Sequence, residues 1–556
     1  MSSRWWEGAT LYQVYVRSFL DTNGDGFGDL PGVRRRLDHL AALGVDGVWL
    51  SPTTPSPDTD WGYDVSDYYG VHPELGDGSD LAGLVSDAAG RGMRVLLDLV
   101  PNHTSDRHPW FLDARSSTDA VYRDWYVWAD PGPDGGPPNN WLDATGAPAW
   151  TLDEVTAQYY LHNFLPTQPD LNWWNPAVRE EFLRILRYWF GRGIAGVRID
   201  VAHALYHDRA LRDDPPCEVG PGARFGLDPV HSMNQPEAHA VYREWRKLAD
   251  EYDPPRLLLG ETWVLDVERM ATFYGHDDEL ALAFNFSFLF SPLAAGPLAE
   301  VVGSTLTALP PGGCPVWAAS SHDVSRFPTR WAGGTAAQAR LALLVLCTLP
   351  GTTVLYQGDE LGLTDVPVRP DQQRDAMSRS PAGGFTRDWA RTPMPWSTGP
   401  HAGFCPGTVE PWLPVGDRRG VSVAEQEADM GSVLWLARRL VQLRRRAFSG
   451  TVRDYEPLLL DGPRWVFRSG PLVVAANLGD HEVAVDVPVA GGVVTLTSRR
   501  DGGTGPERTA GVGLVLAPWE AVVIEEGPAL ERLALGGPSL GGPSLEGARK
   551  RGERRG

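Results

Sequence analysis

Strand-like and helix-like hydrophobic patterns alternate along residues 11–360 of this 556-residue chain. Eight short runs are almost continuously apolar, which is the pattern of parallel strands covered by helices on both faces. Eight strands alternating with helices predict an α/β fold of the (β/α)8 TIM-barrel type. The predicted strands are LYQVYVRSF (11–19), VDGVWLSP (45–52), MRVLLDLVP (93–101), GVRIDVA (196–202), LLLGETW (257–263), LAFNFSF (282–288), VWAASSHD (316–323) and TTVLYQGDE (352–360).

The segments between these runs carry apolar residues at helical spacing. One helix is predicted over 30–44, and another over 175–193, where Asn175 is a suitable cap and Pro176 suits the first helical position. The apolar residues of the second helix lie on one face, which we expect to pack in the core: Val178, Phe182, Ile185, Leu186 and Trp189.

The predicted barrel is interrupted once and followed by a second kind of domain. Residues 1–101 and 175–449 form its two parts, and 102–174, rich in Pro, Gly, Asn and Trp, is an inserted subdomain B after the third strand. Short β-type runs separated by turns predict a C-terminal all-β sandwich domain over 450–527. A GGPSL repeat and a basic end predict a solvated, disordered tail over 528–556.

Composition and charge narrow the choice of partners and compartment. The formal net charge is -21, which disfavours nucleic acid and anionic membranes as partners and suits a neutral small molecule, although solubility alone also explains it. No signal peptide or long apolar run is evident, and the four cysteines have no disulfide or metal-binding spacing. We expect a cytoplasmic monomer or homodimer.

Three acidic residues stand where predicted strands end: Asp200, Glu261 and Asp323. The carboxyl ends of parallel barrel strands share one rim, where such folds place their chemistry. Two carboxyl groups facing one bond are what glycoside cleavage requires: an acid to protonate the leaving oxygen and a carboxylate near the anomeric carbon. The alternative is that each acid merely caps the following helix, which is less plausible for three acids sharing one rim.

The surroundings of two of these acids predict different protonation states. Arg198 lies two residues before Asp200, so both side chains lie on one face of the strand, where the guanidinium favours an ionised Asp200. Glu261 follows an apolar run, so desolvation and the neighbouring carboxylate are expected to raise its pKa, as a general acid requires.

Ordered motifs across residues 4–450 are similar to one family. These motifs are YQVYVRSF, DTNGDGFGDL, GVDGVWLSP, GYDVSDY, DLVPNHTS, QPDLNW, GVRIDVAHAL, LLLGETW, SSHDVSRF, YQGDELGL and RTPMPW. The chain resembles the α-amylase family of glycoside hydrolases, in particular its α-glucosidase and oligo-1,6-glucosidase branch. This resemblance implies Asp200 as nucleophile, Glu261 as acid/base and Asp323 as a third carboxylate that grips sugar hydroxyls as the ring distorts.

The same resemblance implies a set of substrate-binding residues. His103 and His322 would bind sugar hydroxyls, Arg198 would orient the nucleophile, and Asp64 would hold the non-reducing end of the sugar. Tyr63 and Phe164 would supply apolar platforms. A histidine alone is more often structural, so His103 and His322 take their weight from their positions at strand ends.

The loop after the first strand, DTNGDGFGD, alternates oxygen side chains within a glycine-rich turn. That pattern suits a hard divalent cation, although Gly32 at the twelfth position excludes an EF-hand. The resemblance implies a structural Ca2+ or Mg2+ and no cofactor for catalysis; the alternative is a metal-free, hydrogen-bonded turn. The implied ligands are Asp21, Asn23, Asp25, Asp29 and the Phe27 carbonyl.

Together with these patterns, the resemblance implies a retaining, exo-acting α-glucosidase acting on short α-1,4- or α-1,6-linked glucosides through a covalent glucosyl-Asp200 intermediate. An α-glucosyl transferase or isomerase of the trehalose synthase or sucrose isomerase type is the alternative, and a non-catalytic sugar-binding homologue a remote one. In the family, the size of the residue after the nucleophile biases linkage, so Val201 favours α-1,6 or broad specificity. The chain departs from the family pattern at Ser321, at Asp359 and along 361–391. We expect the 361–391 loop to lie beside the leaving group.

Overall fold

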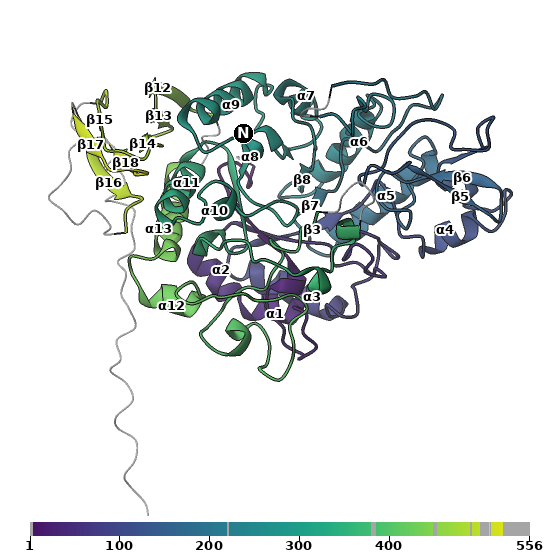
Figure 1. The fold of residues 1–556 in the computed structure, drawn as a ribbon, viewed down its shortest axis with the longest axis horizontal. Helices are drawn as coiled ribbons and strands as arrows, with labels where there is room; N and C mark the ends of the chain where they lie inside the picture. Colours follow the sequence, from purple (N-terminus) through teal and green to yellow (C-terminus); the bar gives the residue numbers. More distant parts are fainter. Residues whose placement is uncertain are drawn as a thin grey trace, which may run out of the picture.

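Eight parallel strands form one sheet that curls into a nearly closed barrel, in the computed structural model of the chain (Figure 1). The structure describes residues 4–218, 222–379, 385–448, 453–489, 492–500, 511 and 513–525. The strand order is β10-β11-β1-β2-β3-β7-β8-β9, and every hydrogen-bonded pair in it is parallel. The strands are β1 (Thr10–Val14), β2 (Gly47–Leu50), β3 (Arg94–Leu99), β7 (Gly196–Ile199), β8 (Leu257–Gly260), β9 (Leu282–Ala283), β10 (Val316–Ala318) and β11 (Thr352–Tyr356).

Each of the eight predicted runs overlaps one of these strands, so the barrel prediction is confirmed. The run at 282–288 is only partly a strand. Its strand ends at Ala283, and α8 (Phe286–Phe290) begins after Asn285, whose side chain accepts a hydrogen bond from the Phe288 amide. The helix expected over 30–44 is two helices, α1 (Leu30–Arg35) and α2 (Leu37–Leu43), that meet at Arg36.

Helices cover the outside of the barrel. Asn175 caps α5 (Pro176–Phe190) through the Ala177 amide, and the predicted apolar face of this helix is buried. The other helices are α3 (Gly78–Ala89), α4 (Pro109–Ala114), α6 (Ala238–Asp250), α7 (Val267–Thr272), α9 (Ala295–Ala308), α10 (Phe327–Arg330), α11 (Ala336–Thr348), α12 (Val423–Ala428) and α13 (Val433–Ala447). In the described part of the chain, no helix is long and apolar enough to cross a membrane.

An antiparallel three-stranded sheet lies in the segment between β3 and α5. Its order is β4 (Trp128–Ala129), β6 (Gln158–Leu161), β5 (Trp150–Asp153). Trp141 and Trp150 belong to its own small apolar cluster. In Figure 1 this sheet lies at one end of the molecule and the C-terminal strands at the other.

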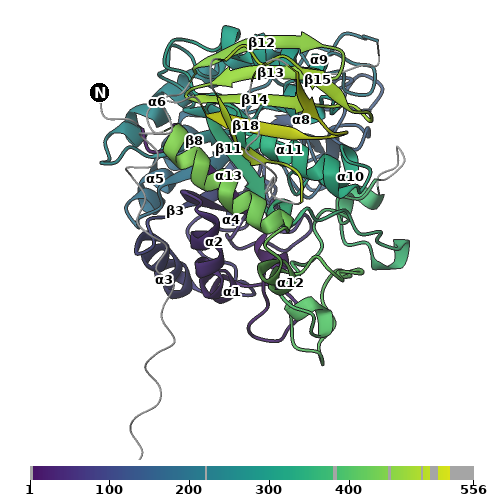
Figure 2. The same cartoon turned by 90° about the vertical axis from the view of Figure 1, so that its left-hand side faces the viewer.

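The C-terminal strands form a small β sandwich. A five-stranded antiparallel sheet faces a two-stranded one, and Val466, Val473 and Ile524 pack against Val485 and Leu516 between them. The opposite face of the larger sheet packs on the barrel side, against α9 and α11 (Figure 2). The strands are β12 (Tyr455–Asp461), β13 (Arg464–Ser469), β14 (Leu472–Asn477), β18 (Ala521–Glu525) and β16 (Val493–Thr497), with β15 (Val483–Val485) and β17 (Leu514–Leu516) in the smaller sheet. The tail predicted over 528–556 lies outside the described residues.

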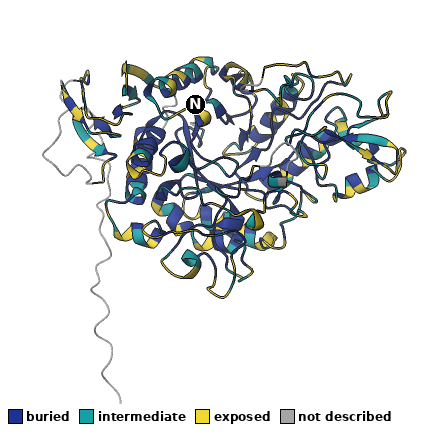
Figure 3. Ribbon diagram, in the orientation of Figure 1, coloured by how far each residue is buried: buried dark blue, intermediate teal, exposed yellow. Residues whose placement is uncertain are grey.

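The interior of the barrel is apolar towards the amino ends of the strands and polar towards their carboxyl ends. Leu11, Leu96 and Val354 belong to the apolar cluster inside the barrel. Because strand side chains alternate, the next inward positions on β1 and β3 are Gln13 and Asp98, which are buried polar groups. Buried residues dominate this central region in Figure 3. The pattern therefore places a buried polar layer at the carboxyl ends of the strands.

Candidate active site

Asp200 and Glu261 contact the same guanidinium. Arg198 Nη1 donates to Asp200 Oδ1 at 2.6 Å, and Nη2 lies 2.8 Å from Glu261 Oε2. Arg198 Nη1 also donates to Asp98 Oδ1 at 2.9 Å. Since the two nitrogens belong to one planar group, the carboxylates of Asp200 and Glu261 lie side by side at the rim of β7 and β8.

Burial sets the protonation preference of this pair. Burial raises the pKa of Glu261 to about 8; Arg198 opposes the shift, and Asp200 adds to it. Burial likewise raises the pKa of Asp200 to about 7, with Arg198 again opposing. The expectation that Arg198 would dominate at Asp200 therefore underestimated desolvation. Because the two buried carboxyl groups share Arg198 and interact with each other, burial raises the pKa of both and their titrations are linked.

Asp323 differs from this pair because two arginines contact it. Arg387 Nη1 lies 3.1 Å and Arg391 Nη2 3.0 Å from Asp323 Oδ1. Burial alone would raise the pKa of Asp323, but His322, Arg387 and Arg391 hold it well below its ordinary value. Asp323 is therefore the permanently ionised acid of the three.

The two predicted histidines are neutral and held by neighbouring groups. His322 Nε2 lies 2.6 Å from the Tyr63 hydroxyl and 3.1 Å from Asp323 Oδ2, and burial lowers the pKa of His322 to about 3. His103 Nε2 lies 3.0 Å from the Tyr63 carbonyl oxygen, and burial lowers the pKa of His103 to about 4. Phe164 packs against His103 with ring centroids 5.1 Å apart.

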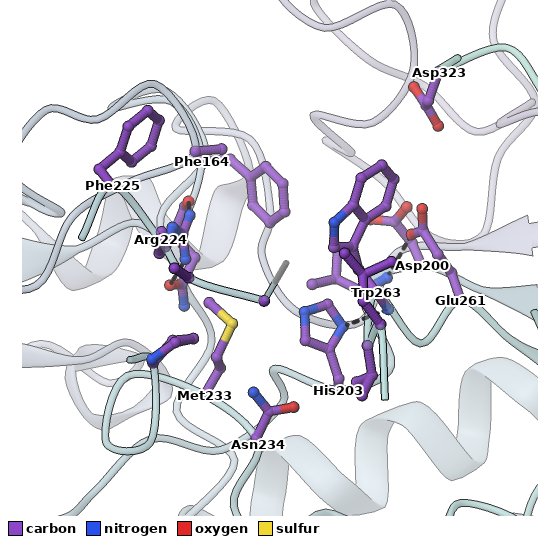
Figure 4. Close-up of a pocket in the computed structure, with 18 of the residues that line it drawn as sticks. Phe164, Asp200, His203, Arg224, Phe225, Met233, Asn234, Glu261, Trp263 and Asp323 are labelled. Atoms are coloured by element: carbon purple, nitrogen blue, oxygen red, sulfur yellow. Dashed lines mark hydrogen bonds between the residues drawn. The ribbon is translucent and has the colours of Figure 1, made fainter. Parts of the chain in front are cut away.

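These residues surround a cavity of about 910 Å³. Of the predicted residues, the lining includes Tyr63, His103, Phe164, Asp200, Glu261 and Asp323. Arg198 and His322 lie behind the lining, in contact with it. In Figure 4 Phe164, Arg224 and Phe225 stand across the cavity from Asp200 and Glu261, with Met233 and Asn234 below.

Asp64 does not line this cavity, contrary to the role expected for it. Its carboxylate is fully buried and accepts hydrogen bonds from the Ser56 hydroxyl and from the amides of Thr59 and Asp60. Asp60 lines the cavity instead, 2.7 Å from Arg387 Nη2. Asp64 therefore stabilises the loop, and Asp60 is the acid that this loop presents to the cavity.

Arg387 joins two walls of the cavity, and the sequence reasoning missed it. Besides Asp60 and Asp323, it contacts Asp375 through Nε at 3.0 Å and Nη2 at 2.7 Å. Its position in the divergent connection after β11 concealed this role, because no local motif links it to Asp60. In the sequence it is an arginine with one acidic neighbour, Asp388, in the segment GFTRDWAR.

The loop after β1 has the oxygen groups expected of a cation site, although hydrogen bonds already engage them. Asp21 accepts from the Gly24 and Gly26 amides, and Asp25 accepts from the Phe27 amide. Asp29 caps α1 through Gly32 and also holds Thr22, so it has the least spare capacity. An ionised carboxylate has about four acceptor positions, so Asp21, Asn23 and Asp25 still fit a hard cation.

Comparison with known proteins gives consistent matches to one family. Residues 13–450 match the family model for the α-amylase catalytic domain, and residues 455–523 match a domain of unknown function, DUF3459. A probable α-glucosidase of Rhizobium meliloti is 42% identical over 79% of this chain and 82% of its own.

Two further relatives match nearly the whole length. An oligo-1,6-glucosidase of Heyndrickxia coagulans is 34% identical over 94% of this chain and 99% of its own. The crystal structure of an α-glucosyl transfer enzyme superposes with a TM-score of 0.85 and 35% identity, covering 94% of this chain and all of the other.

Proposed function

The chain belongs to the α-amylase family of glycoside hydrolases, and from that premise we propose that it is a retaining, exo-acting α-glucosidase. It releases glucose from the non-reducing end of short α-1,4- or α-1,6-linked glucosides. The observation that carries this proposal is the contact of Asp200 and Glu261 with one arginine at the cavity rim. Retaining glycosidases need their two carboxyl groups close together, about 5–5.5 Å apart, so that one attacks the sugar directly.

The mechanism divides the work between the two acids. Glu261 gives its proton to the glycosidic oxygen while Asp200 attacks the anomeric carbon, forming a glucosyl ester and releasing the leaving group. Glu261, now ionised, takes a proton from the incoming water, which attacks the ester and frees Asp200. The higher pKa of Glu261 supports its assignment as the acid. Asp323, kept ionised by Arg387 and Arg391, grips hydroxyls of the distorted ring.

Exo action follows from the wall that Arg387 builds. The Asp60–Arg387–Asp323 contacts bridge the loop after β2 to the connection after β11 on the glucose side of the cavity. Asp60 in this wall takes the place expected for Asp64 and binds the non-reducing end. Tyr63, His103 and Phe164 complete the glucose pocket. Val201 and Met233 lie on the leaving-group side, where Val201 favours α-1,6 linkages.

A second candidate is transfer of glucose to another hydroxyl. The similarity to an α-glucosyl transfer enzyme favours it, as do the exposed aromatic rings of Trp263 and Phe225 in the cavity lining, which are suited to an acceptor molecule. If a sugar hydroxyl replaces water in the second step, the product is a new glucoside.

Separate incubations with maltose, isomaltose, sucrose and trehalose, followed by product chromatography, test these alternatives. The proposal expects free glucose to accumulate from maltose or isomaltose. The glucose released from the non-reducing end should first appear in NMR spectra as the α-anomer, which then mutarotates to the β-anomer. If new disaccharides form with little free glucose, the main reaction is transfer and the hydrolase proposal is wrong. An Asp200→Asn variant that kept more than trace activity would contradict the nucleophile assignment.

Two further properties belong to the same proposal. Asp21, Asn23, Asp25 and the Phe27 carbonyl hold one structural Ca2+ or Mg2+, next to the Asp29 cap of α1. The enzyme is cytoplasmic, which the four free cysteines support.

A further inference from the structure

The buried amide of Gln13 contacts the back of the His322 ring. Gln13 Nε2 lies 2.7 Å from His322 Nδ1, on the side of the ring opposite to Tyr63 and Asp323. Gln13 is fully buried in β1, directly above the apolar layer that contains Leu11. Its side chain therefore reaches the site from inside the barrel.

The groups around His322 fix where its hydrogen must be. The Tyr63 hydroxyl has one hydrogen and lies 2.9 Å from Asp98 Oδ2. An ionised carboxylate only accepts, so Tyr63 donates to Asp98 and accepts from His322 Nε2. Asp323 Oδ2, the other neighbour of Nε2, is also an acceptor. Nε2 must therefore carry a hydrogen.

A neutral imidazole carries only one ring hydrogen, and burial keeps His322 neutral near pH 7. With that hydrogen on Nε2, Nδ1 is an acceptor and needs a donor. The amide of Gln13 supplies one. The opposite amide orientation would set its oxygen against the lone pair of Nδ1 and is disfavoured.

We propose that Gln13 is a positioning residue: by donating to Nδ1, it keeps the hydrogen of His322 on Nε2, facing Tyr63 and Asp323, two residues that line the cavity. Hydrogen bonds then run in one direction from Gln13 through His322 and Tyr63 to Asp98, which Arg198 links to Asp200. Only the kinetic consequence rests on the proposed α-glucosidase function. The position of the hydrogen is a property of the folded chain.

A purely space-filling role explains Gln13 less well. Its Oε1 atom is buried and has no hydrogen-bond partner within the described residues. Burying an acceptor without a partner costs free energy that an apolar side chain of similar size would avoid. The donor half of the amide is the part with a defined partner.

Nitrogen NMR on the full chain labelled with [15N]histidine tests the hydrogen position directly. Two-bond proton–nitrogen correlations distinguish a protonated ring nitrogen from a bare one, and loss of signals in His322→Gln assigns the ring. The proposal expects Nδ1 bare and Nε2 protonated at about pH 7. A protonated Nδ1 in the wild-type protein would overturn it, whatever the substrate proves to be.

Two variants separate positioning from packing. Gln13→Leu removes the donor, and Gln13→Glu offers Nδ1 an acceptor, so the Nδ1 signal of Gln13→Glu is expected to become that of a protonated nitrogen. For Gln13→Leu we expect kcat to fall about 10–100-fold, the range typical for the partner behind a functional histidine, with KM within about threefold of wild type. Wild-type kcat together with unchanged ring signals in Gln13→Leu would refute the role.

Gln357→Leu is the matched control. Gln357 is also fully buried, beside β11, where its Oε1 accepts from the Tyr15 amide, and no hydrogen bond joins it to His322. The control is expected to lower the melting temperature without moving the His322 nitrogen signals. If the α-glucosidase proposal fails while Nδ1 is bare, the positioning role stands and only the reaction assigned to the site changes.

Discussion

Val201 presents its backbone amide to Glu261 Oε2 at 3.0 Å, and it adopts a φ of 46° to do so. A β-branched residue in the left-handed region is strained, at a typical cost of about 1–3 kcal/mol. The residue that follows the proposed nucleophile thus also contacts the proposed proton donor, while its side chain packs with Ala204, Met233 and Phe164 at the cavity. Under the proposed function, Val201 would therefore affect both the linkage preference and the position of Glu261.

Replacing Val201 by Ala removes two methyl groups from the leaving-group side but keeps the amide donor. We expect the ratio of kcat/KM for isomaltose to that for maltose to fall about tenfold, because one methyl-scale contact changes discrimination by about 1–3 kcal/mol. Val201→Thr keeps the shape and is the control for volume. An unchanged ratio in Val201→Ala would remove Val201 from the specificity determinants.

The pair of acids predicts a narrow bell-shaped dependence of kcat/KM on pH. Asp200 must be ionised, so activity is lost as pH falls through its pKa, about 7. Glu261 must be protonated, so activity is lost as pH rises through its pKa, about 8. Measuring kcat/KM for maltose as a function of pH, from below pH 7 to above pH 8, gives the pKa values of the acid and the base in the free enzyme.

Glu261→Gln separates the two limbs of this profile. The basic limb is expected to disappear, because it reports the acid that has been removed. Hydrolysis of maltose is expected to fall about 10²–10⁴-fold, while an aryl glucoside whose leaving group needs no proton loses much less in its first step. Equal losses for both substrates would argue against Glu261 as the acid.

The barrel was predictable because its signal is local. Each buried strand is an apolar run in the sequence, and the three acids follow such runs directly. Where two local signals compete, the prediction was partly wrong. The apolar run 282–288 (LAFNFSF) favours a strand throughout, but Asn285 within it caps α8, so its second half is helical. The cap was visible in the sequence, but the apolar run outweighed it.

The choice between Asp60 and Asp64 was not predictable in the same way. Both lie in the segment DTDWGYD, and what distinguishes them is contact with Arg387, 327 residues after Asp60. The orientation of Gln13 toward His322 likewise depends on a pairing across 309 positions. Such pairings appear only when the barrel closes and brings distant strand ends together.

Arg387→Lys tests the wall of the glucose pocket. Lysine cannot reproduce the forked contacts with Asp60, Asp375 and Asp323, so we expect kcat/KM for maltose to fall about 10²-fold, mainly through KM. Arg369→Lys is the matched control, because Arg369 pairs with Asp371 on the surface of the same connection. Equal effects of the two substitutions would show that Arg387 has no special part in binding.

Calcium dependence tests the loop after β1. Elemental analysis is expected to find one Ca2+ or Mg2+ per chain, and removing it with a chelator should lower the melting temperature by several degrees, since a ligand at about 100 times its Kd stabilises the fold by about 2.7 kcal/mol. In Asp25→Asn, which removes a charged ligand, the calcium-dependent part of this shift is expected to shrink strongly. Asp77→Asn is the control: Asp77 caps α3 outside the loop and asparagine is an equally good cap, so we expect little change in the melting temperature and an intact calcium increment. If the chain contains no metal and its melting temperature changes with neither chelator nor calcium, the loop is a metal-free turn stabilised by the hydrogen bonds of its own aspartates.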